Sequence, residues 1–151
     1  MLSNELQQTL YRALSLARDL GHEYATLEHL LHALLDDVDA APVLQACGVP
    51  LDELAARLEE TFSSFEVSED PDTEPTLAFN RTLQRAVNQM AAAGKESTTG
   101  AQVLVAFFDE NNSAALLALE HFAMTKLDAL EYISHGKTKV RIRSREDAKE
   151  G

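Results

Sequence analysis

The feature that most constrains the fold is an internal repeat. Residues 3–44 align with residues 76–117 at a constant offset of 73, and 12 of the 42 aligned positions are identical. Self-similarity at one offset indicates two copies of one supersecondary unit that share a core. The positions expected to face that core recur at helical spacing and are apolar in both copies: Leu6, Leu10, Ala13, Leu14 and Ala17 against Phe79, Leu83, Ala86, Val87 and Met90.

Each copy has the pattern of a four-helix unit. Thr26 and its counterpart Thr99 are good N-caps, and Gly21 and Gly94 are suited to end the preceding helix. We expect about eight helices, starting near residues 3, 26, 39, 50, 76, 99, 112 and 125. Asn112 is expected to cap the seventh helix. The predicted fold class is all-α, with two four-helix repeats related by a pseudo-two-fold axis.

The last helix is expected to turn an apolar stripe of Leu127, Leu130 and Ile133 toward the core. We predict four segments along the chain. Residues 1–65 form the first repeat, and residues 66–75 form an acidic, solvated linker with five acidic residues and two prolines. Residues 76–136 form the second repeat. Residues 137–151 alternate basic side chains with Thr, Val, Ile and Ser, and suggest a basic connector toward a further part of the protein.

Composition narrows the classes of partner. The chain has 13 basic and 25 acidic residues, a formal net charge of −12, so nucleic acid and membranes are poor partners. No segment approaches the roughly 18 apolar residues that span a bilayer. Cys47 is the single cysteine, which excludes an internal disulfide, and the start of the chain lacks the pattern of a signal peptide. We therefore expect a cytoplasmic protein.

Motifs for catalysis are incomplete. Gly136, Lys137 and Thr138 resemble the end of a phosphate-binding loop, but the glycine required five residues earlier is Glu131. His29 and His32 are three residues apart, whereas zinc proteases need two histidines four apart on one helix. We expect no catalytic residue, metal or cofactor, and exposed or half-buried histidines. A metal-dependent enzyme that uses the region 22–32 remains an alternative.

Positions that differ between the copies are candidates for a specific role. We expect three such pairs to lie on the surface: Glu28 against Ala101, Arg81 against Gln8, and His22 against Lys95. A two-fold scaffold with unlike surfaces suits a module that docks one partner asymmetrically.

Three segments carry a family resemblance. Residues 22–31, HEYATLEHLL, resemble the first-repeat signature of the N-terminal domains of Clp ATPases. Residues 74–86, EPTLAFNRTLQRA, and residues 132–136, YISHG, are similar to the ClpA branch of that family. The resemblance covers about residues 1–142.

The resemblance implies a mobile accessory domain of a hexameric AAA+ unfoldase that supplies the ClpP protease. Such a domain docks the adaptor ClpS, which delivers N-degron substrates, and contacts unfolded protein substrates. By resemblance, the adaptor-binding positions are Glu23, Glu28, Thr76 and Arg81, although Thr76 also fits a plain N-cap. The fragment itself is then not an enzyme. Two alternatives remain: binding of apolar peptides in a groove between the repeats, and the N-domain of a ClpB-type disaggregase.

Overall fold

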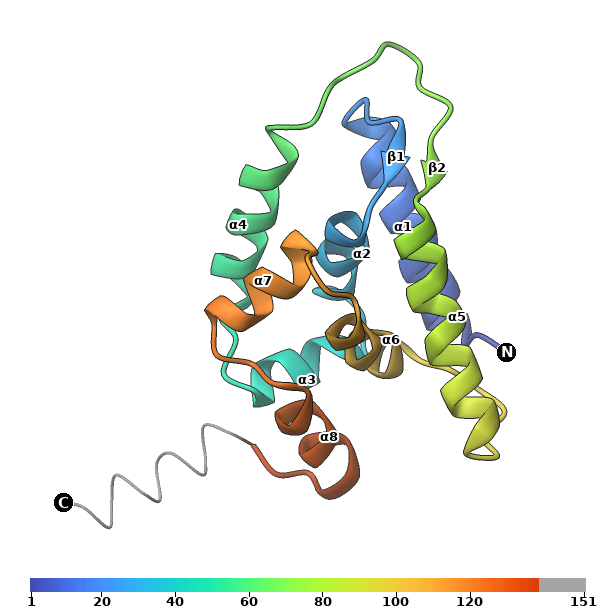
Figure 1. The fold of residues 1–151 in the computed structure, drawn as a ribbon, viewed down its shortest axis with the longest axis vertical. Coiled ribbons are helices and arrows are strands. Elements are labelled where there is room, and N and C mark those ends of the chain that lie inside the picture. Colours follow the sequence, from blue (N-terminus) through green and yellow to red (C-terminus); the bar gives the residue numbers. More distant parts are fainter. Residues whose placement is uncertain (139–151) are drawn as a thin grey trace, which may run out of the picture.

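The computed structural model describes residues 1–138, which form eight α-helices and one short 3-10 helix (Figure 1). This confirms the predicted all-α class. None of these helices has the length and hydrophobicity needed to cross a lipid bilayer. The elements are α1 (Asn4–Asp19), β1 (Tyr24–Ala25), α2 (Leu27–Leu34), α3 (Ala40–Ala46), α4 (Leu51–Phe62), β2 (Glu74–Pro75), α5 (Leu77–Ala92), α6 (Gly100–Ala106), η1 (Phe107–Asp109), α7 (Ala114–His121) and α8 (Lys126–His135).

Side-chain caps fix where several helices begin. The hydroxyl of Thr76 accepts from the backbone N–H of Phe79, and Thr125 accepts from Asp128. These contacts satisfy donors that the first helical turn leaves unpaired. The predicted cap of α7 was wrong by one residue. Ser113 accepts from Leu116 at 3.0 Å, because Asn112 has a φ of 67° and lies in a left-handed turn before the helix.

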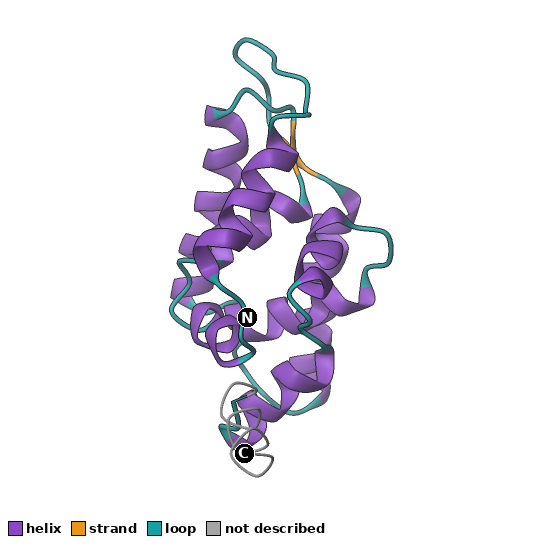
Figure 2. Ribbon diagram, turned by 90° about the vertical axis from the view of Figure 1, so that its left-hand side faces the viewer, coloured by secondary structure: helices purple, strands orange, loops and turns teal. Residues whose placement is uncertain are grey.

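The two repeats are interlocked by two short parallel pairings. Strand β1 pairs with β2 (Figure 2), which joins Ala25 to Pro75. An isolated bridge joins Leu2 to Thr98. At the offset of 73, Leu2 corresponds to Pro75 and Ala25 to Thr98, so each pairing is the symmetry mate of the other. Every segment that leads into a first or second helix is therefore held by the other copy.

Helix packing also joins the two repeats. Helix α3 packs against α6 and α8 of the second copy, and α7 packs against α2 and α4 of the first. Helices α2 and α6 lie at the centre, where Leu31, Leu104 and Phe107 are completely buried (Figure 1). The two copies thus share one core rather than forming two separate bundles.

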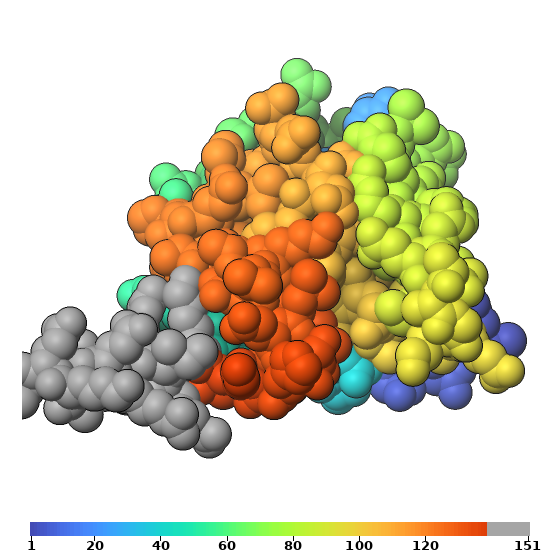
Figure 3. All heavy atoms as spheres, turned by 60° about the horizontal axis from the view of Figure 1, so that its bottom comes forward, coloured from blue at the N-terminus to red at the C-terminus, as the bar shows by residue number. Residues whose placement is uncertain are grey.

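The predicted inward stripe of α8 was wrong. Leu127 is 62% exposed, Leu130 41% and Ile133 38%, whereas Ala129 is buried. Helix α8 packs against α3 and α6, has Ala129 on its buried face, and lies at the surface of the described part of the chain (Figure 3). The repeat register slips before this helix, so the first copy gave no guide to its orientation.

The predicted linker is mostly exposed, but it is tied to the first repeat. The backbone N–H of Ser68 donates to Gly21 O at 2.8 Å, and the hydroxyl of Thr73 donates to His22 O at 2.7 Å. Gly21 has a φ of 79°, and a Cβ there would come within 2.7 Å of a Val67 methyl carbon, so the site requires glycine. Most of the predicted basic connector, from residue 139 onward, lies outside the described residues.

Candidate docking surface

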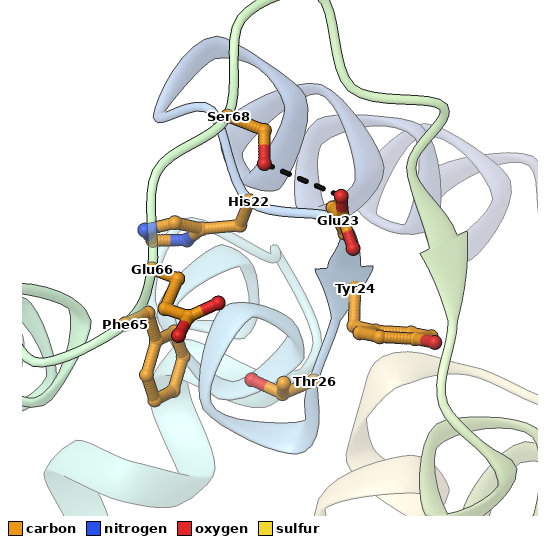
Figure 4. Close-up of a pocket in the computed structure, with 7 residues that line it drawn as sticks. All are labelled: His22, Glu23, Tyr24, Thr26, Phe65, Glu66 and Ser68. Atoms are coloured by element: carbon orange, nitrogen blue, oxygen red, sulfur yellow. Dashed lines mark hydrogen bonds between the residues drawn. The ribbon is translucent and has the colours of Figure 1, made fainter.

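Two adjoining pockets lie beside the pairing of β1 with β2, and both are lined by Thr26. The first, here called the histidine pocket, has a volume of about 260 Å³ (Figure 4). The second, here called the arginine pocket, has a volume of about 330 Å³. The histidine pocket is lined by His22, Glu23, Tyr24, Thr26, Phe65, Glu66 and Ser68. The arginine pocket is lined by Thr26, Leu27, Glu28, Thr76, Ala78, Arg81, Glu110, Asn111, Asn112, Ser113 and Ala114.

A buried pair of histidines lies at the histidine pocket, and one of them, His22, lines it. His29 Nδ1 accepts the backbone N–H of Thr26 at 2.9 Å, and His29 Nε2 lies 2.8 Å from His22 Nδ1. This arrangement assigns the proton of His29 to Nε2, from which it is donated to His22. The ring of Phe62 stacks on His29 with centroids 4.5 Å apart. The expectation of exposed or half-buried histidines was wrong for this pair, since His22 is 4% exposed and His29 is fully buried.

Burial makes both rings harder to protonate. Burial, with smaller contributions from the charges of His22 and His32, lowers the pKa of His29 to about 4, and burial also lowers the pKa of His22. Both nitrogens of His29 are used by hydrogen bonds within the protein. Within residues 1–138 no group of three or more His, Cys, Asp or Glu side chains is arranged to hold a metal ion. The geometry therefore gives no support to a metal-dependent enzyme at residues 22–32.

Arg81 forms one side of the arginine pocket through an ion pair with Glu110. Its Nε and Nη2 donate to the two carboxylate oxygens at 2.7 and 2.6 Å, and Arg85 Nη1 donates to Oε2 at 3.0 Å. Because Glu110 is 5% exposed, its charge depends on these partners. The hydrogen bond from Arg81 is the largest cause that lowers the pKa of Glu110 to about 2, and the same bond raises the pKa of Arg81.

Glu28 was expected on the surface, and this expectation was wrong. It is 9% exposed, and its Oε2 accepts the backbone N–H of Ala115 at 3.0 Å. Ala115 lies in the first turn of α7, where free N–H groups and the helix dipole attract a carboxylate. Glu28 therefore fastens the loop and helix that form one side of the arginine pocket to α2 of the other repeat.

Replacing Glu28 is accordingly expected to weaken folding. Glu28→Ala leaves the Ala115 N–H buried without an acceptor, which costs about 1–3 kcal/mol of the free energy of unfolding. Glu28→Gln keeps an oxygen acceptor and is expected to lose less. Urea unfolding monitored by circular dichroism measures both values. Equal stability of Glu28→Ala and the wild type would contradict the capping role.

The remaining predicted residues are accessible. Glu23 is exposed in the histidine pocket and accepts from Ser68 Oγ at 3.2 Å (Figure 4). The side chain of Arg81 is 57% exposed. Thr76 caps α5 and also lines the arginine pocket, so its two interpretations are compatible. The structure thus gathers all four predicted residues around two adjoining pockets, with Glu28 beneath the surface.

Two apolar residues at this surface were missed by the sequence analysis. Tyr24 is 56% exposed at the rim of the histidine pocket, and Leu77, next to Thr76, is 82% exposed. The signal was present in the sequence, since both are large apolar residues next to an N-cap segment and lie outside the helical stripes. Exposed aromatic side chains of this kind often anchor protein interfaces.

The symmetry-related position of the arginine pocket has different side chains. This position lies between Gln8 and Ala101, the counterparts of Arg81 and Glu28. There the carboxylate of Asp37, the counterpart of Glu110, fills the space beside Gly100, and a Cβ on Gly100 would overlap it. In the second copy Arg81 and Arg85 hold Glu110 instead. The pseudo-symmetric scaffold therefore presents one asymmetric surface.

Comparison with known proteins identifies this arrangement of repeats. Residues 1–122 match the family described as the Clp repeat (R) N-terminal domain. The chain belongs to this family. The prediction from the sequence is therefore confirmed, and the matched Clp repeats are those of an N-terminal domain rather than of an ATPase module.

Individual relatives agree with this assignment. A ClpA homolog protein from Fuscovulum blasticum is 43% identical over 142 residues, which make up 91% of this chain and 18% of that relative. The Clp repeat chain thus spans less than a fifth of that relative's length. The N-terminal domain of the ClpV1 ATPase from E. coli superposes with a TM-score of 0.74 at 17% identity, over 91% of this chain and 88% of that one. The N-domain of ClpV from Vibrio cholerae gives 0.71 at 23% identity, over 88% and 82%. These two structures show the same fold.

Proposed function

We propose that this domain is a non-catalytic docking module of a ClpA-type unfoldase and that it binds a ClpS adaptor through the surface around the two pockets. Glu23, Thr76 and Arg81 contact the adaptor, and Glu28 acts from beneath by fixing the start of α7. The observation that carries the proposal is that the residues matching the family's docking positions gather at one accessible surface, and that the two copies differ at Glu28 and Arg81.

The charges and apolar groups of this surface define a complementary partner. Glu23 and Glu66 make the histidine pocket acidic, so a basic group of the adaptor fits there. Arg81, at the other pocket, favours an acidic group. Tyr24 and Leu77 add exposed apolar area near these charges. This mixture gives a partner one preferred orientation, which suits the delivery of a substrate in a fixed direction.

We infer the assembly of the parent protein from its ClpA-type relative. Because a ClpA homolog is 43% identical, we propose that the parent protein is a hexameric AAA+ ATPase of the cytoplasm that works with ClpP. The adaptor would bring N-degron substrates to this domain, and the missing ATPase modules would unfold them for proteolysis. On this proposal the domain itself carries out no chemical step.

Direct peptide binding is a second candidate function. A groove of about 490 Å³ runs between α4 of the first repeat and α7 of the second, and Leu117 on its wall is 62% exposed. A ClpV N-domain of the same fold, at 22% identity and a TM-score of 0.67, has been solved in complex with a VipB peptide. An apolar segment of an unfolded protein could lie in the groove between the repeats.

Charge changes on the two pockets test the adaptor proposal. Glu23→Lys combined with Arg81→Gln is expected to weaken adaptor binding about tenfold or more. Both charges are changed together because one rim charge alone is often worth under about 1 kcal/mol. Isothermal titration with the ClpS of the same genome measures the dissociation constants. Glu96→Lys is the matched control for the Glu23→Lys change, since Glu96 is the exposed counterpart of Glu23 and its replacement makes the same change of charge. Full affinity of the double variant would exclude this surface.

A further inference from the structure

The hydroxyl of Thr82 is buried without a hydrogen-bond partner. Thr82 lies on α5, is 0% exposed, and its Oγ1 has no donor or acceptor in the described part of the chain. Leaving a buried hydroxyl unpaired costs free energy, so such groups call for an explanation. No other buried side-chain nitrogen or oxygen within residues 1–138 is left in this way.

The first repeat shows what this hydroxyl does when it is paired. Thr9, the counterpart of Thr82, donates its hydroxyl hydrogen to Asp37 Oδ2 at 2.6 Å. Arg12 Nη2 lies 3.1 Å from the same hydroxyl and donates to it. Threonine, acid and arginine therefore form one hydrogen-bonded group in the first copy, in which the threonine and the acid are buried.

The second repeat has the same three types of residue in a different arrangement. Thr82, Glu110 and Arg85 occupy the positions of Thr9, Asp37 and Arg12. What differs is Arg81, whose counterpart is the uncharged and exposed Gln8. Arg81 takes both oxygens of Glu110 in a bidentate pair, and the hydroxyl of Thr82 is left without its acid.

We propose that Glu110 has two positions, one on Arg81 and one on the hydroxyl of Thr82, and that it moves to Thr82 when a carboxylate of the docked partner binds Arg81. The role of the partner's carboxylate rests on the proposed docking function. Arg85 also donates to Glu110, so release of Arg81 leaves the acid beside a second cation. Arg81 is more than half exposed, so a carboxylate can approach its guanidinium from solvent.

In the position on Arg81, Glu110 forms an ion pair that keeps the guanidinium group ordered until the partner binds. The incoming carboxylate replaces one ion pair of Arg81 with another, and the displaced acid gains the hydrogen bond that Thr82 lacks. A partner with a neutral or basic group at this position gains no such exchange. The exchange therefore makes the surface specific for an acidic group opposite Arg81.

A double-mutant cycle on the isolated domain tests the movement of Glu110 without any partner. In the wild type, Thr82→Val removes an unpaired hydroxyl and is expected to raise the melting temperature by about 2–4 °C. Arg81→Gln gives the second copy the residue of the first, so Glu110 is free to bond Thr82. In that background Thr82→Val is expected to lower the melting temperature by a similar amount. The same sign in both backgrounds would overturn the two positions of Glu110.

Calorimetric titration with the adaptor tests whether a carboxylate of the partner displaces Glu110 from Arg81. Thr82→Val is expected to weaken binding roughly tenfold, because Glu110 then has no hydroxyl to move to. Thr82→Ser keeps the hydroxyl and is expected to bind like the wild type. Equal binding by Thr82→Val would overturn the exchange at Arg81 while leaving the docking function intact. If the wild type itself fails to bind, the docking function and the receptor role of Arg81 both fail, and the cycle alone decides the movement of Glu110.

Discussion

Leu31→Ala and Leu104→Ala are each expected to lower the free energy of unfolding by about 2–5 kcal/mol. The two leucines are symmetry counterparts on α2 and α6, and both are completely buried in the shared core. Removing either side chain leaves a cavity between helices of both repeats, since α2 and α6 each pack against both copies. We therefore expect one cooperative unfolding transition, shifted as a whole, in both variants.

Urea unfolding followed by circular dichroism and by tyrosine fluorescence measures this effect. Leu117→Ala is the control, because Leu117 is 62% exposed and its loss is expected to change stability by under about 0.5 kcal/mol. Two separate transitions, or a loss confined to one of the core variants, would show that the repeats fold as independent units. That result would contradict the interlocked core.

Acid is expected to destabilise the domain through the buried pair His22 and His29. A histidine whose pKa is lowered on folding binds protons more tightly when the chain is unfolded. The contribution of His29 to stability is complete above pH 6.5, and it is lost as the pH falls toward about 4. The difference between these values corresponds to about 3 kcal/mol for His29. Glu110 adds its own loss only below 4.5, as the pH falls toward about 2.

The second repeat supplies the control for this prediction. Gln102 is the counterpart of His29, and its side-chain oxygen accepts the backbone N–H of Thr99 at 2.8 Å. His29→Gln is therefore expected to keep the cap on α2 while removing the titrating ring. Chemical unfolding at pH 7.5 and 4.5 should show a smaller loss for His29→Gln than for the wild type. An equal loss would assign the acid sensitivity to other groups.

Much of the fold could be predicted because the repeat and the helix caps are local signals. The stripe that includes Leu6 and Phe79 follows from helical spacing, and Thr99 and Thr125 cap the helices that the sequence assigned to them. The orientation of α8 could not be predicted, because its face depends on how it meets α3 and α6. Its stripe of Leu127, Leu130 and Ile133 has correct helical spacing but faces outward.

The docking surface was predicted in its members but not in its geometry. Glu28 and Ala115 are 87 positions apart, and only the packing of α7 of the second repeat against α2 of the first brings them together. The burial of His22 likewise depends on the segment that follows α4, since Phe65 lies edge-on to its ring with centroids 5.2 Å apart. Such contacts have no pattern along the chain, so sequence periodicity cannot reveal them.

The most direct test of the docking account is an NMR titration of the ¹⁵N-labelled domain with unlabelled ClpS from the same genome. The account predicts saturable one-to-one binding, with amide shifts concentrated at Glu23, Tyr24, Thr76 and Arg81. The symmetry counterparts Glu96, Ser3 and Gln8 should stay unchanged, which serves as an internal control. Shifts at the counterparts as well, or no shifts at high adaptor concentration, would contradict asymmetric docking of the adaptor at this surface.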